Sequence, residues 1–229
     1  MGMEIIILAA GMGSRLGNPF PKPLTPLKTG KSIMLSQLES LAAAFPHSNT
    51  TVVVGFKKEM IMETFPDLVF IYNNEFDTTN TSKSLFRALR KVNHTGALWL
   101  NGDVVFDPAV LEKIKPLIKD ERSFVCVNRS RVGEEEVKYT IDTRGFIREL
   151  SKKVKNALGE AVGINYISRK DVKTLLKRLD ECGPNDYFER GIELAIEKDG
   201  LEIVPADISE FTCVEVDFRQ DLEKANELL

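Results

Sequence analysis

The stretch of sequence with the clearest capacity for chemistry is residues 8–24, which read LAAGMGSRLGNPFPKPL. Gly11 and Gly13 let the backbone approach a ligand closely and adopt positive φ angles, and consecutive N–H groups in such a loop can form an anion-binding nest. Arg15 adds a guanidinium whose planar fork matches phosphate oxygens. Lys22 adds a second cation between two prolines, which restrict its backbone. The segment therefore favours binding of a polyanion such as a triphosphate.

Two familiar phosphate-binding loops do not fit this sequence. The dinucleotide fingerprint requires a third glycine that opens directly into a helix, but Leu16 occupies that position and prolines follow it. The phosphate loop of many nucleotide hydrolases ends in Gly-Lys-Ser. Residues 30–32 read GKS, but Thr25 stands where the first glycine is required. We interpret residues 28–31 as a polar turn and Ser32 as the cap of the next helix.

A carboxylate follows a second apolar segment. Residues 97–100 read ALWL, and Asn101-Gly102-Asp103 come next. In open α/β sheets, ligands bind beyond the carboxyl ends of the strands, and Mg²⁺ is commonly held by one or two carboxylates plus substrate phosphates. Asp103 is therefore a candidate metal ligand, with a turn or cap aspartate as the alternative. Asp107 precedes Pro108 and is better interpreted as a helix cap.

The first half of the chain alternates strand and helix patterns, and these elements must position the candidate residues. Short β-branched or apolar runs predict strands at 4–8, 50–54, 68–72, 97–100 and 124–127. Helical patterns lie between them at 32–44, 58–65, 82–92 and 108–119. Such alternation predicts right-handed βαβ units and an open parallel sheet.

The pattern changes in the second half. Residues 137–141 and 146–150 flank the turn sequence DTRG, which predicts a hairpin. Further strands are expected at 161–167, 201–205 and 213–216, with helices at 171–179, 187–197 and 221–228. No repeat or linker interrupts the chain, so residues 1–229 are expected to form a single domain. Residues 1–128 would be its nucleotide-binding half, and 129–229 its acceptor-binding and metal-completing half.

The bulk composition excludes several classes of protein. The net charge is −3, whereas a dedicated nucleic-acid binder usually carries a basic excess. The three cysteines form no CxxC pair, which disfavours a zinc site or a disulfide framework. The first apolar run is too short for a signal peptide or a membrane span. We therefore expect a cytoplasmic protein with neither nucleic-acid nor membrane partners. The only histidines, His47 and His94, fall in polar loops and are expected to be solvated without a role.

LAAGMGSRLGNPFPKPL resembles the signature of the nucleotidyltransferase family that makes nucleotide-activated sugars and alcohols. The resemblance implies an α/β fold with a Rossmann-like mixed, mainly parallel sheet of the nucleotide-diphospho-sugar transferase (glycosyltransferase-A-like) kind. It also implies an NTP bound over the glycine loop and Mg²⁺ held by two carboxylates. The residues that it places around the nucleotide are Leu8, Ala9, Ala10, Gly11 and Gly13.

The same resemblance assigns roles to the charged residues. Arg15 would bind the leaving phosphates, and Lys22 the phosphate at the reacting centre. Asp103 would join them in the catalytic set as a metal ligand, with Asp217 as the second ligand near the C-terminus. Glu215 competes with Asp217 for the metal, and Asp217 could instead cap the last helix.

One segment favours a particular branch of the family. Sugar-1-phosphate members commonly carry a P-x-G-T-A-x-A-like segment after the third strand, but residues 72–85 read YNNEFDTTNTSKSL. This segment is more similar to the phosphocholine cytidylyltransferase branch. By position, Asn80 and Ser84 would then lie beside the nucleotide, which favours CTP. The alternative is plain helix capping by Thr81 or Ser82.

The acceptor side carries a weaker pattern. Residues 159–165, GEAVGIN, resemble the sugar-contacting strand of the family, which makes Glu160 and Asn165 candidate acceptor ligands. Tyr166, Tyr187 and Phe188 could line a site for a cationic acceptor, whereas Trp99 is expected in the core. Asp186 and Glu189 lie at a predicted helix start, where they could simply favour its dipole.

These observations predict a magnesium-dependent nucleotidyltransferase. It would transfer CMP from CTP to a small phosphorylated alcohol, amino-alcohol or sugar and release pyrophosphate. Within the class, the alternative is a uridylyl-, thymidylyl- or guanylyltransferase acting on a sugar-1-phosphate. Outside it, the alternatives are a non-catalytic nucleotide-sensing domain, against which the charged set argues, and a glycosyltransferase. A D-x-D metal motif is typical of the latter, but Val104 and Val105 follow Asp103.

Overall fold

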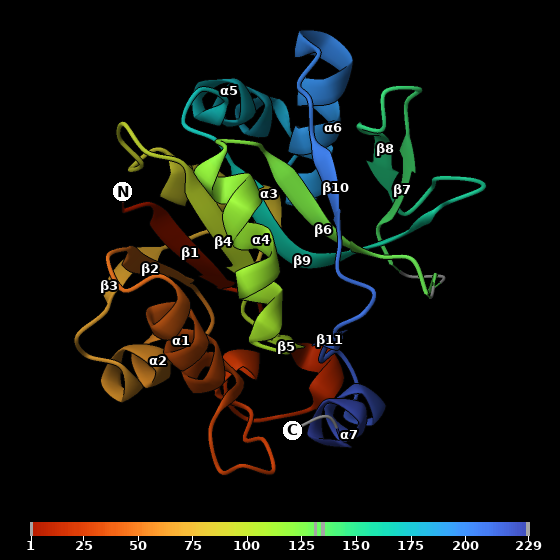
Figure 1. Ribbon diagram of the computed structural model, residues 1–229. Coiled ribbons are helices and arrows are strands. Elements are labelled where there is room, and N and C mark those ends of the chain that lie inside the picture. The colour runs from red at the N-terminus through yellow and green to blue at the C-terminus, as the bar shows by residue number, and fades with distance from the viewer. Residues whose placement is uncertain (1, 131, 134–135, 228–229) are drawn as a thin grey trace.

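One extended sheet organises the molecule, as the computed structural model in Figure 1 shows. The structure describes residues 2–130, 132–133 and 136–227. Its main path of paired strands runs in the order β10 (Val204–Asp207), β6 (Phe124–Asn128), β9 (Gly159–Ile167), β4 (Ala97–Asn101), β1 (Glu4–Ala9), β2 (Asn49–Val54) and β3 (Val69–Tyr72). A hairpin of β7 (Lys138–Ile141) and β8 (Ile147–Ser151) branches from β9. The hairpin confirms the pattern that the sequence predicted around residues 142–145.

The sheet is mixed but mainly parallel, which confirms the predicted fold class. Strands β4, β1, β2 and β3 pair in parallel, and so do β10 and β6. Strand β9 is antiparallel to both of its neighbours, β4 and β6. A strand from the second half of the chain therefore lies between two strands from the first half, which the strand–helix alternation alone did not predict.

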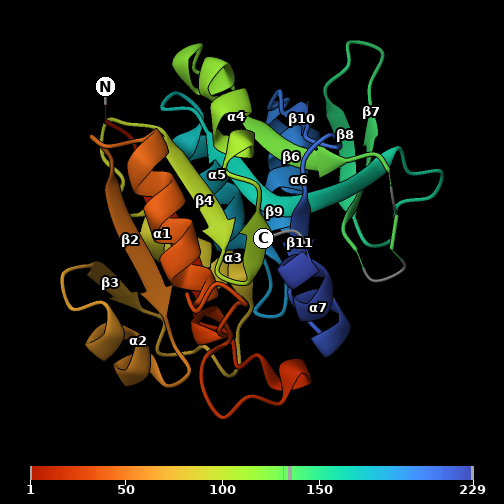
Figure 2. The ribbon, with the colours of Figure 1, turned by 60° about the horizontal axis from the view of Figure 1, so that its bottom comes forward.

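Helices cover both faces of this sheet (Figures 1 and 2). One face packs against α3 (Thr81–Leu89), α5 (Val172–Glu181) and α6 (Phe188–Asp199), and the other against α1 (Ile33–Ala44), α2 (Lys58–Thr64) and α4 (Ala109–Lys119). Side chains of β1 alternate between the two faces: Ile6 and Leu8 face the first set of helices, and Ile5 and Ile7 face the second. Burial on both faces explains why β1 is a continuous apolar run, since each fully buried isoleucine contributes roughly 1.5–3 kcal/mol.

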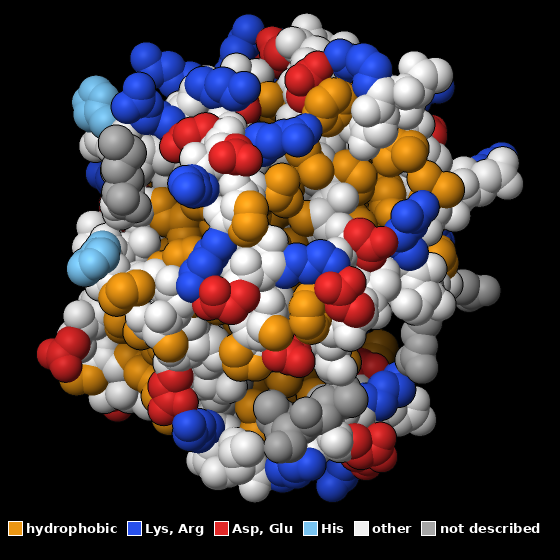
Figure 3. Space-filling view, viewed as in Figure 1, with side chains coloured by type: hydrophobic (Ala, Val, Ile, Leu, Met, Phe, Trp, Pro, Cys, Tyr) orange, Lys and Arg blue, Asp and Glu red, His pale blue; other side chains and the backbone are white. Residues whose placement is uncertain are grey.

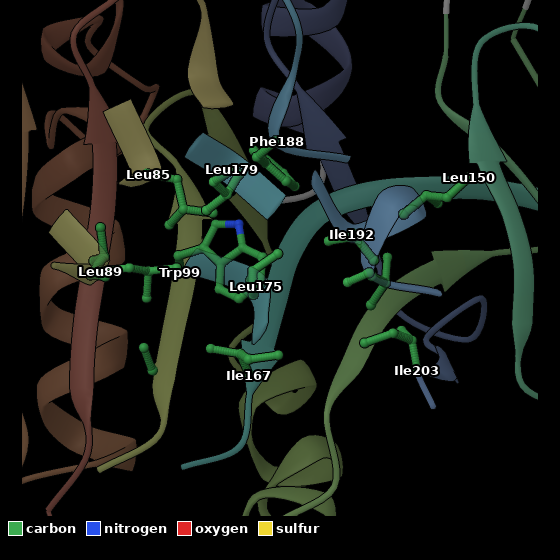
Figure 4. Packing of buried hydrophobic residues seen from close by; sticks show 14 of the residues in the cluster. Leu85, Leu89, Trp99, Leu150, Ile167, Leu175, Leu179, Phe188, Ile192 and Ile203 are labelled. Atoms are coloured by element: carbon green, nitrogen blue, oxygen red, sulfur yellow. The ribbon is translucent and has the colours of Figure 1, made fainter. Parts of the chain in front are cut away.

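Trp99 anchors the first of these two cores. It is 1% exposed, and its ring meets that of Phe188 edge to face, with 5.6 Å between the ring centroids. Figure 4 shows the two rings among Leu85, Leu175 and Leu179 from α3 and α5. Trp99 is therefore a core residue, as expected.

The C-terminal segment returns to the N-terminal loops. Strand β11 (Cys213–Glu215) pairs antiparallel with β5 (Val104–Phe106), and α7 (Arg219–Glu227) packs nearby (Figure 2). The Asn226 carboxamide oxygen accepts a hydrogen bond of 2.7 Å from the backbone N–H of Lys28. The backbone N–H of Val216 donates to the carbonyl of Asp103 at 3.0 Å. These contacts bring residue 217 beside residue 103, although 114 positions separate them in the sequence.

Most predicted elements form close to their expected bounds, with a few differences. Ser32 caps α1 through a 3.2 Å hydrogen bond from Leu35 N–H, as predicted. Strand β10 begins at Val204, later than the predicted 201–205, while Leu201 and Ile203 are buried beside the first core without being part of a strand. Strand β5 was not predicted as a separate element. Among the described helices, none is both long and apolar enough to cross a membrane.

The surface carries charges of both signs. On the face shown in Figure 3, Lys and Arg side chains are interspersed with Asp and Glu and with small apolar areas. His47 and His94 are exposed, as expected from their polar surroundings in the sequence.

Candidate active site

A cavity of about 330 Å³ opens at the carboxyl ends of β1 and β4. Its wall combines the glycine loop, the segment after β4, the starts of α3 and α6, and the end of β11. The lining residues are Leu8, Ala9, Gly11, Gly13, Arg15, Lys22, Pro23, Asn80, Thr81, Asn101, Gly102, Asp103, Glu136, Val137, Lys152, Ala161, Tyr187, Phe188, Glu189, Glu215 and Asp217. The cavity thus lies where open α/β sheets bind their ligands.

The glycine loop brings Lys22 to the end of β1. Gly13 has φ +58°, and a Cβ atom added there would lie 3.0 Å from the Cβ of Lys22. A larger residue at position 13 would therefore strain the backbone and crowd Lys22. The loop continues through two short 3₁₀ turns, Ser14–Leu16 and Lys22–Leu24. Pro21, with a φ of −55°, precedes the second turn. A short turn bounded by prolines therefore follows the glycine loop here, where a dinucleotide site would have a helix.

Lys22 joins two carboxylates that are far apart in the sequence. Its Nζ donates to Asp103 Oδ2 at 2.8 Å and to Asp217 Oδ1 at 2.5 Å. The other oxygen of Asp217 accepts from Arg15 Nη1 at 3.2 Å. The Arg15 guanidinium also lies 5.8 Å from the ring centroid of Phe218. The structure therefore brings together the four residues predicted to form the catalytic and metal-binding set.

These contacts hold the four side chains in a charge-paired state. Burial acts to lower the pKa of Lys22, but Asp103 and Asp217 outweigh it and raise that pKa. Burial acts to raise the pKa of Asp217, but the hydrogen bond and charge of Lys22, with Arg15, lower it. Lys22 is therefore a cation and Asp217 an anion at neutral pH.

The chemistry of this oxygen set fits a divalent cation. One oxygen of Asp103 and one of Asp217 contact the same nitrogen, Lys22 Nζ. The two carboxylates therefore converge on a position that attracts a cation. Among the described residues, no group of three or more His, Cys, Asp or Glu side chains converges as a metal site. Two carboxylates completed by substrate oxygens and water are a common arrangement for Mg²⁺. Asp103 and Asp217 are the residues that could hold it.

A third carboxylate lies just behind this pair. Glu215 Oε1 accepts a 2.8 Å hydrogen bond from Asn101 Nδ2. A Cβ atom on Gly163 would come within 2.5 Å of the same oxygen, so the glycine, at φ +72°, provides the room for it. Burial, followed by the charge of Asp103, raises the pKa of Glu215 well above its usual range. Asp217 shares the Lys22 ammonium group with Asp103, whereas Glu215 is paired with Asn101, so Asp217 is the better placed of the two to hold a metal with Asp103.

Glu189 is a buried carboxylate in the same wall. It lies in the first turn of α6 and is 7% exposed, and its Oε2 has no hydrogen-bond partner among the described residues. Burial raises its pKa to about 7, opposed by its own backbone N–H and by Lys152. The charge of Glu189 is in turn one of the causes that raise the pKa of Glu215.

This raised pKa predicts a pH-dependent gain in stability for Glu189→Gln. The ordinary pKa of a glutamate is 4.5, and that of Glu189 in the folded protein is about 7. Between these two pH values the folded protein keeps a proton that the unfolded chain releases. The free energy of unfolding of the wild type therefore falls as pH rises through this window. The stability of the glutamine variant does not fall in this way. Its free energy of unfolding, relative to that of the wild type, should therefore rise from pH 5 to pH 8, towards an upper limit of roughly 3 kcal/mol.

Thermal melts across this pH range test the effect. Glu197→Gln, on the exposed part of the same helix, is the control and should track the wild type, because that side chain is 50% exposed. A constant difference between Glu189→Gln and the wild type at every pH would contradict the buried, titrating carboxylate.

The residues predicted to bind the nucleotide divide into two groups. Leu8, Ala9, Gly11, Gly13 and Asn80 line the cavity. Asn80 is also the cap of α3, since its Oδ1 accepts from Thr81 N–H at 2.8 Å. The alternative capping residues, Thr81 and Ser82, thus lie inside the helix.

Two of the predicted nucleotide ligands are not in the described cavity wall. Ala10 is buried, and its carbonyl accepts from Phe56 N–H at 3.1 Å. Ser84 is 5% exposed, and its Oγ accepts from Asn73 Nδ2 at 3.1 Å. Ser84 therefore supports the loop after β3 rather than facing the cavity.

The predicted acceptor ligands also lie outside the described wall. Glu160 Oε2 accepts from Gly133 N–H at 2.9 Å, whereas the next residue, Ala161, does line the cavity. Asn165 is 1% exposed and pairs with Trp99 and Val125 in the middle of the sheet. It lies four residues beyond Ala161, or about 13 Å along the strand. The structure thus places Asn165 in the sheet interior, outside the described cavity wall.

Sequence reasoning missed several charged residues of the wall. Glu136 and Lys152 were not singled out, and Glu189 was interpreted only as favouring a helix dipole. Burial, followed by the charges of Glu160 and Asp217, raises the pKa of Glu136. Lys152 Nζ lies 4.9 Å from the ring centroid of Tyr187. The signal that could have found Glu136 is its place just before the hairpin strand that borders the site.

A mixed α/β sheet with a glycine loop, two cations and two carboxylates at its carboxyl edge defines the nucleotidyltransferase class. The pattern of the MobA-like NTP transferase domain matches residues 5–179. The chain therefore belongs to this family.

Curated relatives match about half of the chain. The CMP-5'-(3-aminopropyl)phosphonate synthase of Streptomyces rubellomurinus is 37% identical over 121 residues, which cover 49% of this chain and 19% of the relative. The bifunctional protein GlmU of Nitrosospira multiformis is 32% identical over 117 residues, covering 51% of this chain and 25% of the relative. The chain thus spans about a quarter or less of the length of these proteins.

Solved structures share the fold over nearly the whole chain. The inositol-1-phosphate CTP transferase from T. maritima has a TM-score of 0.79 at 18% identity and covers 99% of this chain and 94% of its own. The CTP:phosphocholine cytidylyltransferase from Streptococcus pneumoniae has a TM-score of 0.75 at 17% identity and covers 99% of both chains. At such identities the likeness shows the fold alone.

Proposed function

We propose that this protein transfers the NMP part of a nucleoside triphosphate, preferentially CTP, to the phosphate or phosphonate group of a small alcohol, amino-alcohol or sugar. The observation that carries the proposal is the junction of Lys22 with Asp103 and Asp217, beside Arg15 and the glycine loop. The family of the chain supports the nucleotidyltransferase class.

The reaction needs charge neutralisation and positioning more than covalent work by the protein. An oxygen of the acceptor's phosphoryl group attacks the α-phosphorus of the NTP and forms a new P–O–P bridge. The bond from the α-phosphorus to the bridging oxygen of the leaving group breaks, and pyrophosphate departs with that electron pair. Because the acceptor oxygen is already ionised at neutral pH, no side chain has to remove a proton. Arg15 and Lys22 offset the repulsion between the two anionic reactants.

Asp103 and Asp217 would hold Mg²⁺ in this scheme. The metal would supply charge neutralisation on the phosphate oxygens and on the leaving pyrophosphate. The phosphates would at the same time offer Lys22 new anionic partners. Lys22 would then bind phosphate, while Asp103 and Asp217 would bind the metal.

CTP is favoured by two observations. A curated relative, 37% identical over the matched segment, is named for a CMP-linked product. The cavity is also bordered by Asn80, the residue expected beside the nucleotide from the segment 72–85. GlmU also matches, and a structural neighbour from Bacillus anthracis is described as a glucose-1-phosphate thymidylyltransferase, so the rival is a sugar-1-phosphate enzyme that uses another base.

A panel assay tests both parts of the proposal. The protein is incubated with Mg²⁺, each of CTP, UTP, dTTP, GTP and ATP, and a set of phosphorylated alcohols, amino-alcohols and sugars, and pyrophosphate release is measured. We expect acceptor-dependent release that is highest with CTP. Release with UTP, dTTP or GTP but not CTP would contradict the base preference, and release with no pair would contradict the transfer reaction.

A further inference from the structure

The carboxyl group of Glu189 is the part of the cavity wall that the transfer reaction leaves unexplained. A buried carboxylate without a hydrogen-bond partner on one oxygen is costly, because it has lost water without a full replacement. Glu189 is 7% exposed, its Oε2 has no partner among the described residues, and the residue lines the cavity. Rotation about the terminal torsion, which is broad for glutamate, can present either oxygen to a ligand. The site is thus built to receive a hydrogen-bond donor.

Acidic side chains outnumber basic ones in the wall near Glu189: Glu136 and Glu215 stand against Lys152, whose charge lowers the pKa of Glu189. Glu215 lies in the same wall, where its Oε1 accepts from Asn101 Nδ2 at 2.8 Å. The cations Arg15 and Lys22 are already paired, Arg15 with Asp217 and Lys22 with both Asp103 and Asp217. A ligand that spans the cavity would therefore meet Arg15 and Lys22 at its phosphoryl end and a mainly acidic wall, with Lys152 as its cation, at the other end.

The described wall does not offer the aromatic cage that a quaternary ammonium group requires. Phe188 is 1% exposed, and its ring lies edge to face with Trp99, as Figure 4 shows. The ring of Tyr187 is occupied by Lys152 Nζ at 4.9 Å. A trimethylated nitrogen also has no N–H to donate, so it would leave Glu189 without a hydrogen-bond partner.

We propose that Glu189 is a specificity-determining residue that binds a primary ammonium group of the acceptor. The acceptor is then a zwitterion, an aminoalkyl phosphate or aminoalkyl phosphonate. This inference rests on the proposed transfer reaction and narrows its acceptor. A sugar hydroxyl could donate to Glu189 as well, but it would bring no charge to offset the buried carboxylates. The ammonium group provides both the donor and the charge.

Matched acceptors test the inference. Phosphoethanolamine carries the primary ammonium, phosphocholine carries three methyl groups on the same nitrogen, and 2-hydroxyethyl phosphate replaces the ammonium with a neutral hydroxyl. 3-Aminopropylphosphonate also carries a primary ammonium group, and comparing it with phosphoethanolamine shows whether the acceptor is a phosphonate or a phosphate. With CTP and Mg²⁺, we expect kcat/KM for the better amine to exceed that for phosphocholine and for 2-hydroxyethyl phosphate by about 10²-fold.

The variant Glu189→Gln keeps the shape of the side chain and removes its charge. We expect it to lower kcat/KM for the amine by about 10²-fold, mainly through KM, and to change kcat/KM for 2-hydroxyethyl phosphate by less than about threefold. Calorimetry with a non-reacting α,β-methylene nucleotide should show the same loss of amine binding. Glu197→Gln, on the same helix, should leave every acceptor unchanged.

The possible failures are distinguishable. Equal use of phosphocholine and phosphoethanolamine, or an unchanged amine preference in Glu189→Gln, would overturn the role of Glu189 while leaving the transfer reaction intact. Turnover with sugar phosphates but with no amine would do the same. The absence of pyrophosphate release with every nucleotide and acceptor would overturn the proposed function and this inference together.

Discussion

Asp103→Asn is expected to lower kcat/KM for pyrophosphate release by about 10²–10³-fold, the size of loss seen when an enzyme loses one group that stabilises charge in the transition state. The substitution removes the anion that pairs with Lys22 at 2.8 Å and one of the two carboxylates proposed to hold Mg²⁺. The backbone contact survives, because Val216 N–H donates to the main-chain carbonyl of residue 103. The fold should therefore persist while turnover is lost.

Steady-state kinetics and thermal melts on the same preparations separate the two effects. Asp107→Asn is the matched control: Asp107 is exposed, and its carboxylate accepts from Ala109 N–H at the start of α4. Asparagine can cap in the same way, so this variant should retain activity. Turnover of Asp103→Asn within threefold of the wild type would remove Asp103 from the mechanism.

Lys22→Met is expected to have opposite effects on turnover and on metal affinity. Turnover should fall by about 10²–10³-fold, because the reacting phosphates lose a cation. In the nucleotide-free protein, however, Lys22 Nζ is bound to the two carboxylates that a divalent cation would use. Its removal should tighten Mn²⁺ binding by about tenfold, which corresponds to roughly 1.4 kcal/mol.

Electron paramagnetic resonance of free Mn²⁺ measures this affinity without any turnover. Lys28→Met serves as the control, because residue 28 is exposed in the same N-terminal region. It should leave Mn²⁺ binding unchanged. Weaker Mn²⁺ binding in Lys22→Met would contradict the competition between Lys22 and the metal.

The glycine loop and its charged neighbours were predictable because local sequence determines them. An apolar run buried on both faces, a loop that needs Gly13 and a lysine between two prolines are each visible within residues 4–24. Asp103 could be found in the same way, since it directly follows a buried strand. Asp217 needed the family resemblance, because its closeness to Asp103 depends on the pairing of β11 with β5.

The central position of β9 could not be deduced from periodicity. Its apolar pattern predicts a strand but carries no information about its neighbours, and it pairs antiparallel with both β4 and β6. Asn165 illustrates the consequence: a polar residue near a family-like segment suggested a ligand contact, but the pairing of β9 buries it beside Trp99 and Val125. Its Nδ2 and Oδ1 have no hydrogen-bond partner among the described residues.

The acidic part of the cavity wall could not be predicted from the sequence for a related reason. Glu136, Glu189 and Glu215 come from three separated segments, and each has an ordinary interpretation in its local sequence. Only the packing of α6 against the sheet shows that Glu189 is buried and lines the same cavity as Glu215. Tertiary structure, rather than any motif, thus brings these acidic residues together in one cavity wall.

A crystal structure with CTP and Mg²⁺, in the absence of acceptor, tests the central claim most directly. We predict that the triphosphate lies over residues 11–13 with its oxygens within hydrogen-bond reach of Arg15 and Lys22, and that Asp103 and Asp217 ligate the metal. A nucleotide bound elsewhere on the protein, with the loop between β1 and Lys22 left empty, would contradict the account.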